Sequence, residues 1–245
     1  MNYHETRQST NDTMTNATTL NIHFMANEGP HAGPAQLKQL VIAGWTGRDR
    51  EAMEKHIAEL EELGVPRPAS TPVYYRVAAS RLTQAPCIEV SGDDSSGEAE
   101  FVLAQLGGRL WVGIGSDHTD RKLETAGVTL SKQVCDKPIG TTFWAYDDVA
   151  PHWERLVLRS YIHEGGKRVL YQEGPVTTMR DPLELVAGWT DSAGQLPEGA
   201  AMFCGTLAAK GGIRGSQRFE MELHDPVLQR TLSHHYEIAP LPIAG

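Results

Sequence analysis

The chain has 245 residues and a formal net charge of −9 at pH 7. An acidic surface disfavours nucleic acids and anionic membranes as partners, since both reward positive charge, so we expect a small-molecule ligand. Three scattered cysteines argue against a disulfide framework or a paired-cysteine zinc site and favour a reducing, cytoplasmic setting. No apolar stretch of the sequence reaches the roughly 20 residues that a membrane span requires.

The first 70 residues divide into a polar tail and a segment with regular structure. Residues 1–18 are rich in Asn, Thr and Ser and poor in large apolar side chains, which predicts a flexible tail. In residues 19–70, the alternation over 19–25 predicts a strand, and the apolar run 40–45 predicts a buried strand ending at a glycine. After residue 70 the pattern indicates mostly short strands and turns.

A helix is expected over residues 49–63, because its apolar residues fall on one stripe and Gly64 follows it. Within this helix His56 and Glu59 are three positions apart, so their side chains can meet on adjacent turns. Such a pair can orient a water molecule and take its proton. The helix also carries many other charged residues, and a plain solvated helix is the more common interpretation of that pattern.

A pair of glutamates suggests a metal site. Glu98 and Glu100 are two positions apart, and alternate side chains of an extended strand share a face. Asp117 lies just after the next predicted strand. Because Mg²⁺, Mn²⁺ and Ca²⁺ prefer carboxylate oxygens, we predict that these three residues bind a divalent cation. His118 and Asp120 are alternative third ligands, although a histidine suits zinc or iron better.

These residues belong to a longer series of motifs between residues 40 and 238. In chain order the series includes His56-Ile57-Ala58-Glu59, Pro72-Val73-Tyr74-Tyr75-Arg76, Glu98-Ala99-Glu100-Phe101, Ser116-Asp117-His118-Thr119-Asp120-Arg121, Lys132 to Gly140, and Phe203-Cys204-Gly205-Thr206. The order and composition of these motifs resemble the fumarylacetoacetate hydrolase superfamily, in a branch known as a domain of unknown function. Arg76 stands near a family lysine, and the Gly-Thr turn lacks the family's proline.

The resemblance implies a fold and a cofactor. The fold is α+β and mainly β, a mixed β-roll of the fumarylacetoacetate hydrolase catalytic-domain type over residues 71–245 with a few peripheral helices. Residues 19–70 would contribute a lid. The cofactor would be Mg²⁺ or Mn²⁺, with Ca²⁺ as an alternative, held by Glu98, Glu100 and Asp117. Members of the family are commonly homodimers.

The resemblance also implies a role for each site residue. The implied catalytic residues are His56, Glu59 and Lys132, and the implied substrate contacts are Arg76, Arg121, Gln172, Gly205 and Thr206. The implied reaction is hydrolysis of a C–C bond in an acylpyruvate-like or 1,3-dicarbonyl acid through a metal-stabilised enolate. Burial and a nearby cation would lower the pKa of Lys132.

Other functions fit the same motifs. Decarboxylation or hydration of a 2-oxo acid uses the same scaffold and the same cation, and so would a sugar-acid dehydratase. A non-catalytic binding protein that kept the fold is a different class of function, because a shared fold does not fix the chemistry of its site. Loss of metal binding in a Glu98 variant that still folds would separate the metal enzyme from the binding protein.

Overall fold

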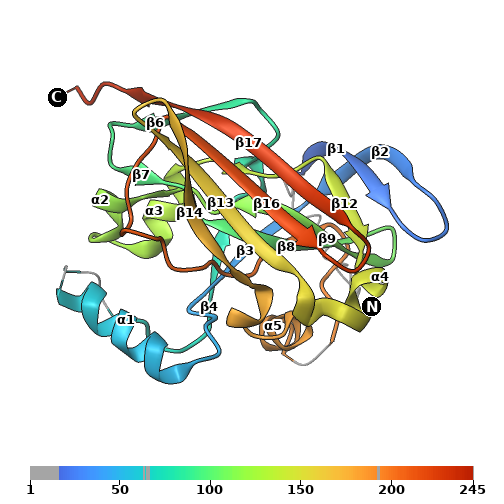
Figure 1. Ribbon diagram of the computed structural model, residues 1–245. Coiled ribbons are helices and arrows are strands. Elements are labelled where there is room, and N and C mark those ends of the chain that lie inside the picture. Colours follow the sequence, from blue (N-terminus) through green and yellow to red (C-terminus); the bar gives the residue numbers. More distant parts are fainter. Residues whose placement is uncertain (1–16, 63, 65–66, 192–193, 245) are drawn as a thin grey trace, which may run out of the picture.

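The computed structural model describes residues 17–62, 64, 67–191 and 194–244 (Figure 1). Most of the predicted tail therefore lies outside the described residues. In the described part of the chain, no helix is both long and apolar enough to cross a membrane.

The larger of two main sheets has eight strands and curls around its own core (Figure 1). In spatial order its strands are β2 (His31–Leu37), β1 (Thr18–Met25), β12 (Thr142–Ala145), β9 (Arg109–Ser116), β8 (Ala99–Leu106), β15 (Ala200–Phe203), β3 (Gln39–Gly44) and β4 (Val73–Val77). The sheet is mixed, because β1 pairs with β12 and β15 with β3 in parallel, while neighbours such as β8 and β9 are antiparallel.

The second sheet packs against one face of the first. Its order is β14 (Lys167–Pro175), β13 (Val157–Glu164), β16 (Arg218–Asp225), β17 (Arg230–Leu241) and β6 (Cys87–Ser91). Two short pairs complete the strands: β10 (Thr119–Asp120) with β7 (Ser95–Ser96), and β11 (Lys137–Pro138) with β5 (Leu82–Thr83). The described helices are α1 (Arg50–Glu62), α2 (Arg121–Glu124), α3 (Val128–Val134), α4 (Tyr146–Val149), α5 (Pro182–Trp189) and the 3₁₀ turns Ala79–Arg81, Ala150–Arg155 and Val176–Thr178.

The core lies on both faces of β8, which explains why that strand is continuously apolar. Phe101 and Leu103 belong to the cluster between the two sheets, whereas Val102 and Ala104 belong to the cluster inside the curl. A strand buried on both faces does not alternate between apolar and polar residues. The mainly β fold with few helices is confirmed, as are the strands expected near 19–25 and 40–45 and the helix expected near 49–63.

Two glycines of β9 make room for aromatic rings inside the curl. A Cβ added at Gly113 would lie 2.4 Å from the ring of Phe143, and one at Gly115 would lie 2.5 Å from the ring of Phe203. Side chains at these positions would push the rings out of the core. The glycines therefore allow close packing along the strand that leads to Asp117.

Replacing Gly113 should test this packing. We expect Gly113→Ala to lower the free energy of unfolding by about 1–3 kcal/mol, the usual cost of overpacking a core. Gly33→Ala is the control, because a Cβ at Gly33 meets nothing within 4 Å and should change stability by less than about 0.5 kcal/mol. Urea denaturation of both variants makes the comparison, and equal stabilities would contradict it.

Candidate metal centre

The start of β8 and the end of β9 bring three carboxylates together. Glu98 directly precedes β8, Glu100 lies within it, and Asp117 directly follows β9. The antiparallel register pairs Ala99 with Ser116, so these segments lie side by side. One carboxylate oxygen from each of Glu98, Glu100 and Asp117 lies within 4.8 Å of the other two. We call these three residues the carboxylate triad.

The triad is mostly withdrawn from solvent. Glu100 and Asp117 are buried, while the Glu98 side chain keeps 18% exposure. Burial, followed by repulsion from Asp117 and Glu98, raises the pKa of Glu100 well above its ordinary value. The backbone N–H of Gly205 donates a hydrogen bond of 2.7 Å to Glu100 Oε2. Charges this close are stabilised when a cation lies between them.

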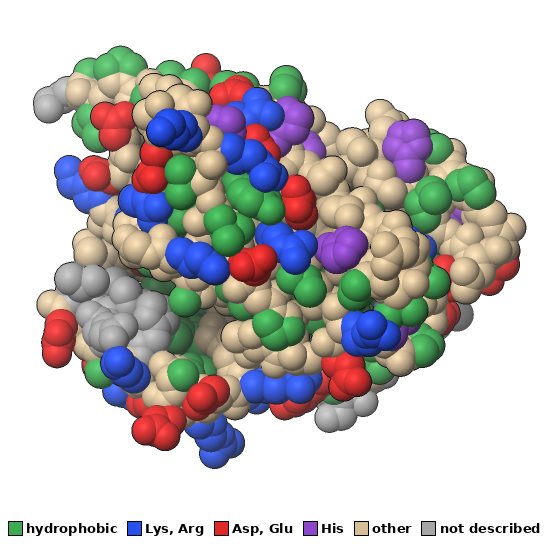
Figure 2. All heavy atoms as spheres, viewed as in Figure 1, with side chains coloured by type: hydrophobic (Ala, Val, Ile, Leu, Met, Phe, Trp, Pro, Cys, Tyr) green, Lys and Arg blue, Asp and Glu red, His purple; other side chains and the backbone are tan. Residues whose placement is uncertain are grey.

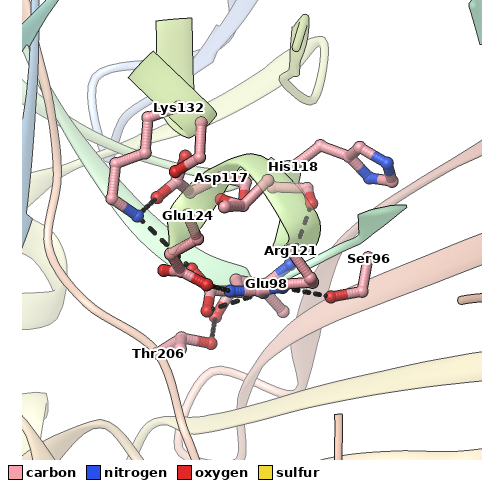
Figure 3. Close-up of polar contacts among 12 residues, drawn as sticks. Ser96, Glu98, Asp117, His118, Arg121, Glu124, Lys132 and Thr206 are labelled. Atoms are coloured by element: carbon pink, nitrogen blue, oxygen red, sulfur yellow. Dashed lines mark hydrogen bonds and ion pairs between the residues drawn. The ribbon is translucent and has the colours of Figure 1, made fainter. Parts of the chain in front are cut away.

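Lys132 on α3 lies beside the triad. Its Nζ donates to Asp117 Oδ2 and lies 3.7 Å from Glu98 Oε2, and Figure 3 shows the side chain reaching toward both residues. Burial lowers the pKa of Lys132, but the carboxylates of Asp117 and Glu98 outweigh burial and raise it above its ordinary value. The fall expected from the sequence required a bound cation beside Lys132, so it stays a prediction for the metal-loaded protein.

A second buried lysine was missed by the sequence analysis. Lys137 Nζ donates to the carbonyl oxygens of His118 at 2.6 Å, of Cys135 at 3.0 Å and of Lys132, and it lies 3.4 Å from Asp117 Oδ1. Burial lowers the pKa of Lys137. Burial alone would raise the pKa of Asp117, but Lys132 and Lys137 together lower it below its ordinary value.

The triad fits a hard divalent cation. Asp117 Oδ1 is buried and accepts no hydrogen bond from the described residues. Its neighbour Lys137 Nζ lies 3.4 Å away and donates to three carbonyls. The three side chains offer only oxygen ligands, which Mg²⁺ and Mn²⁺ prefer. Asp117 thus offers an oxygen that is paired with Lys137 by charge and lies within reach of two further carboxylates.

The two alternative third ligands have other partners. Asp120 caps α2, because its carboxylate accepts a hydrogen bond of 2.8 Å from the backbone N–H of Leu123. The ring of His118 is bonded to Tyr236 and Ser95, and Figure 3 shows it directed away from the carboxylates. The structure therefore favours Asp117 as the third member of the site.

Removing Asp120 should separate capping from metal binding. We expect Asp120→Ala to lower the free energy of unfolding by about 1 kcal/mol, the usual value of an N-cap, and to leave the affinity for Mn²⁺ unchanged. Chemical denaturation and calorimetric titration measure the two quantities. A large fall in Mn²⁺ affinity would instead make Asp120 a ligand.

Arg121 at the start of α2 is held by protein groups. Its guanidinium donates to Glu98 Oε1 at 2.9 Å, to Ser96 Oγ at 2.7 Å and to Glu124 Oε2 at 3.1 Å. Burial opposes its charge, but Glu98 and Glu124 raise the pKa of Arg121 above its ordinary value. In this arrangement Arg121 orients Glu98 (Figure 3), and the predicted contact with substrate stays a prediction.

Gln172, Gly205 and Thr206 fix the start of β8. Gln172 is buried and uses both ends of its amide: Oε1 accepts from the N–H of Ala99 and from Ser160, and Nε2 donates to Thr206 Oγ1 and to the carbonyl of Leu207. Thr206 Oγ1 donates to the carbonyl of Ala99 at 2.7 Å. Gln172 and Thr206 thus hold both backbone groups of the residue between the two glutamates.

Gly205 takes a left-handed conformation with φ of +95°, which favours glycine. A Cβ there would lie 1.8 Å from Thr46 Oγ1, so no larger residue fits without rearrangement. This close approach lets the Gly205 N–H reach Glu100.

The profile of a family described as a protein of unknown function (DUF2848) matches residues 43–236. The chain belongs to the DUF2848 family. A search of curated proteins finds no match, whereas solved structures resemble the DUF2848 chain over most of its length. One, assigned as a fumarylpyruvate hydrolase from Burkholderia cenocepacia, has a TM-score of 0.61 and 16% identity, covering 92% of this chain and 97% of that one.

Two further structures show the same likeness. A protein assigned as a fumarylacetoacetate isomerase/hydrolase from Oleispira antarctica has a TM-score of 0.60 and 18% identity, covering 88% of this chain and 98% of its own. A 2-keto-3-deoxy-D-arabinonate dehydratase, solved with magnesium and 2,5-dioxopentanoate, has a TM-score of 0.61 and 16% identity, with coverages of 84% and 74%. The fold of the fumarylacetoacetate hydrolase superfamily, predicted from the motif order, is confirmed.

In the DUF2848 chain, β4 presents Tyr75 to the site and turns Arg76 away from it. The Nζ of Lys132 lies 5.7 Å from the centre of the Tyr75 ring, and the Tyr75 hydroxyl accepts a hydrogen bond of 3.2 Å from Trp45 Nε1. Arg76 is exposed, and its guanidinium lies 5.6 Å from the ring of Trp189. Alternation along a strand puts neighbours on opposite faces, so Tyr75 is the residue of β4 beside Lys132, and the substrate contact predicted for Arg76 stays a prediction.

The described part of the chain has hollows near the triad and at the far end of the strands that carry it. A cavity of about 310 Å³ lies between β4 and the start of α3, with Tyr75, Val73 and Val128 in its lining. A larger one, of about 850 Å³, includes Phe24, Trp111 and Gly107 and lies at the β8–β9 turn, at the opposite end of both strands from the triad. On the face shown in Figure 2, the surface is hollowed between α1 and the pair α2 and α3.

His56 and Glu59 lie on α1, but their side chains are outside the part of the chain that the structure describes. Their catalytic role stays a prediction.

Proposed function

We propose that this DUF2848 protein is a divalent-metal-dependent enzyme that hydrolyses a C–C bond in an acylpyruvate-like or 1,3-dicarbonyl acid. The observation that carries the proposal is the carboxylate triad, in which Glu98, Glu100 and Asp117 each bring one oxygen within 4.8 Å of the others. A structural neighbour that was solved with magnesium and a small dioxo acid supports the choice of cofactor and ligand class.

Glu98, Glu100 and Asp117 would hold Mg²⁺ or Mn²⁺, and the cation would supply the Lewis acidity that polarises a substrate carbonyl. The Lys132 ammonium lies beside Asp117 and Glu98 and can stabilise negative charge on a substrate oxygen. Arg121 orients Glu98 through their hydrogen bond. His56 and Glu59 would take a proton from the attacking water and return it to the leaving carbon.

The surroundings of the triad favour a small anionic substrate. Glu98 is the partly exposed member of the triad, so a ligand would approach from its side. The cavity of about 310 Å³ shares Tyr75 with the surroundings of Lys132 and has room for an acyl group. Its lining is mixed, because Val73 and Val128 lie beside Ser70 and the charged Arg67, so it does not by itself select the acyl group.

Dehydration of a 2-oxo sugar acid is the second candidate function. The dehydratase neighbour matches this chain as well as the hydrolase neighbour does, each with a TM-score of 0.61. The two reactions differ in whether water attacks a carbonyl or leaves the substrate, and the triad would serve both. Decarboxylation of a 2-oxo acid would likewise use the triad, and the expected homodimer and cytoplasmic location stay predictions.

Metal binding and turnover should be measured together. We expect chelator-treated protein to bind Mg²⁺ and Mn²⁺ in calorimetric titrations and, once loaded, to convert an acylpyruvate into pyruvate and a carboxylic acid, identified by NMR. A 2-keto-3-deoxy sugar acid and a simple 2-oxo acid complete the substrate panel, because their products reveal dehydration or decarboxylation.

Glu98→Gln should lose both metal binding and turnover. Glu124→Gln is the matched control, since Glu124 also accepts a hydrogen bond from Arg121 but is outside the triad. Wild-type protein that binds neither cation would overturn the proposal. Metal binding without turnover on any of the three substrates would instead favour a binding protein.

A further inference from the structure

The turn that carries Asp117 is bonded to a tyrosine of the opposite sheet. The hydroxyl of Tyr236, on β17, lies 2.9 Å from Ser116 Oγ and 2.9 Å from His118 Nδ1. One hydroxyl therefore contacts both residues that flank Asp117. His118 Nε2 lies 2.9 Å from Ser95 Oγ, and all of these polar side chains are buried.

The same network reaches the backbone of a second triad member. Ser116 Oγ accepts a hydrogen bond of 3.2 Å from the backbone N–H of Glu98. The backbone N–H of Asp117 in turn donates to the carbonyl of Glu98 at 3.0 Å. Tyr236 is thus connected to the backbone at Glu98 through one serine, and to the residues on both sides of Asp117 directly.

The hydrogens of this network fit two orders of donation. If Ser116 donates to Tyr236, Tyr236 can donate to His118 Nδ1, and the Nε2–H of His118 can donate to Ser95. In the reverse order Ser95 donates to His118 Nε2, the Nδ1–H of His118 donates to Tyr236, and Tyr236 donates to Ser116. Either order leaves one serine hydrogen at the end of the network without an acceptor in it, and in both the ring of His118 carries a single N–H. Burial, with positive charge on Lys137 and Arg121, lowers the pKa of His118 to about 3, in agreement with a neutral ring.

We propose that Tyr236 is a positioning residue of the metal centre, whose hydroxyl fixes the separation of Asp117 and Glu98 through Ser116 and His118. This inference rests on the proposed metal-dependent function. It is separate from packing, because the Tyr236 ring lies against Phe219 with centroids 5.8 Å apart, and a phenylalanine would fill the same space between the sheets.

The positioning role of Tyr236 follows from the precision with which a metal site needs its ligands to be placed. Ligands must be held to within about 0.5 Å, which requires support behind the residues that touch the metal. Lys137 holds the carbonyl of His118 at 2.6 Å while Tyr236 holds its ring, so the residue after Asp117 is fixed at both its main chain and its side chain. Ser116, before Asp117, is fixed by Tyr236 and by the Glu98 N–H.

Tyr236→Phe tests the inference, and Tyr171→Phe is the matched control. Tyr171, on β14, is also a buried tyrosine that contacts Phe219, with centroids 6.2 Å apart. Its hydroxyl accepts from the backbone N–H of Arg214 at 3.2 Å, so the control deletes a buried hydroxyl that is bonded to neither Ser116 nor His118. Both variants should lose thermal stability to a similar extent.

The readout is Mn²⁺ binding, measured by calorimetry and by the electron paramagnetic resonance spectrum of the bound ion. We expect Tyr236→Phe to weaken Mn²⁺ binding by about 10–100-fold, the usual effect of losing an outer-shell partner, and to broaden the spectrum. Tyr171→Phe should leave both unchanged. Ser116→Ala breaks the same connection to Glu98 and should repeat the loss, which keeps the test decisive if Tyr236→Phe does not fold.

The outcomes separate the two proposals. Wild-type protein that does not bind Mn²⁺ overturns the proposed function and this inference with it. Wild-type protein that binds Mn²⁺, together with folded Tyr236→Phe and Ser116→Ala variants of unchanged affinity and spectrum, overturns the positioning role alone. An equal loss in Tyr171→Phe also overturns it, because the effect would then come from general packing.

Discussion

Glu100→Gln is expected to weaken the binding of Mg²⁺ and Mn²⁺ by at least about 100-fold, more than the loss of an outer-shell partner usually costs. Glutamine has nearly the same shape and keeps an oxygen that can accept the hydrogen bond from the Gly205 N–H, now 2.7 Å long. One oxygen of Glu98 and one of Asp117 lie within 4.8 Å of a Glu100 oxygen, so carboxylates stand near the new amide. The substitution therefore removes one negative charge from the triad and little else.

The same variant should be more stable than wild type in the presence of a chelator. Burial and repulsion from Asp117 and Glu98 raise the pKa of Glu100 above its ordinary value of 4.5. The folded state therefore binds a proton more tightly than the unfolded state does. The resulting stability is fully present below about pH 4.5 and is lost as the pH rises through the folded-state pKa, by about 1.4 kcal/mol for each pH unit between the two pKa values.

The pKa of Asp117 shifts in the opposite direction, so its contribution to stability does not obscure that of Glu100. Its pKa lies below the ordinary value of 3.8, so its contribution is present above that value and is lost only as the pH falls further. Urea denaturation of wild type and Glu100→Gln, with chelator, from about pH 5 to about pH 8 should thus show a stability difference that grows with pH. A constant difference, or undiminished Mn²⁺ binding by the variant, would contradict the assignment of Glu100.

Sequence periodicity was sufficient to predict the strands that carry the triad. Glu98 and Glu100 lie on one face because they alternate with Ala99, and Asp117 follows the next strand, as the pattern predicted. The choice between Asp117 and Asp120 also had a sequence signal that was not used: an aspartate directly before a helix is a common N-cap, and Asp120 caps α2.

Residues that reach the site across long sequence distances could not be predicted in this way. Tyr236 lies 120 positions from Ser116, and Tyr75 comes from β4, at the edge of the same sheet. Lys137 belongs to a motif that was recognised, but its burial depends on the carbonyl groups of the turn around it. Periodicity specifies which face a side chain occupies and not which distant element covers that face.

Lys137→Met is expected to lower the free energy of unfolding by about 3–5 kcal/mol, the usual cost of breaking a buried ion pair. Methionine fills a similar volume but donates no hydrogen bond. The carbonyls of His118, Lys132 and Cys135 would lose their donor. Lys167→Met on β14 is the control, because that lysine is exposed and its loss should change stability by less than about 0.5 kcal/mol.

Urea denaturation at neutral pH measures the free energy of unfolding of both variants. A loss below about 1 kcal/mol in Lys137→Met would show that the carbonyls find other donors. Lys132 and Lys137 differ in the groups to which they donate. Lys137 donates to three main-chain carbonyls and cannot move without leaving them unpaired, whereas the described hydrogen bond of Lys132 Nζ is to the carboxylate of Asp117. Of the two lysines beside Asp117, Lys137 therefore holds the turn, and the contact of Lys132 with a ligand stays a prediction.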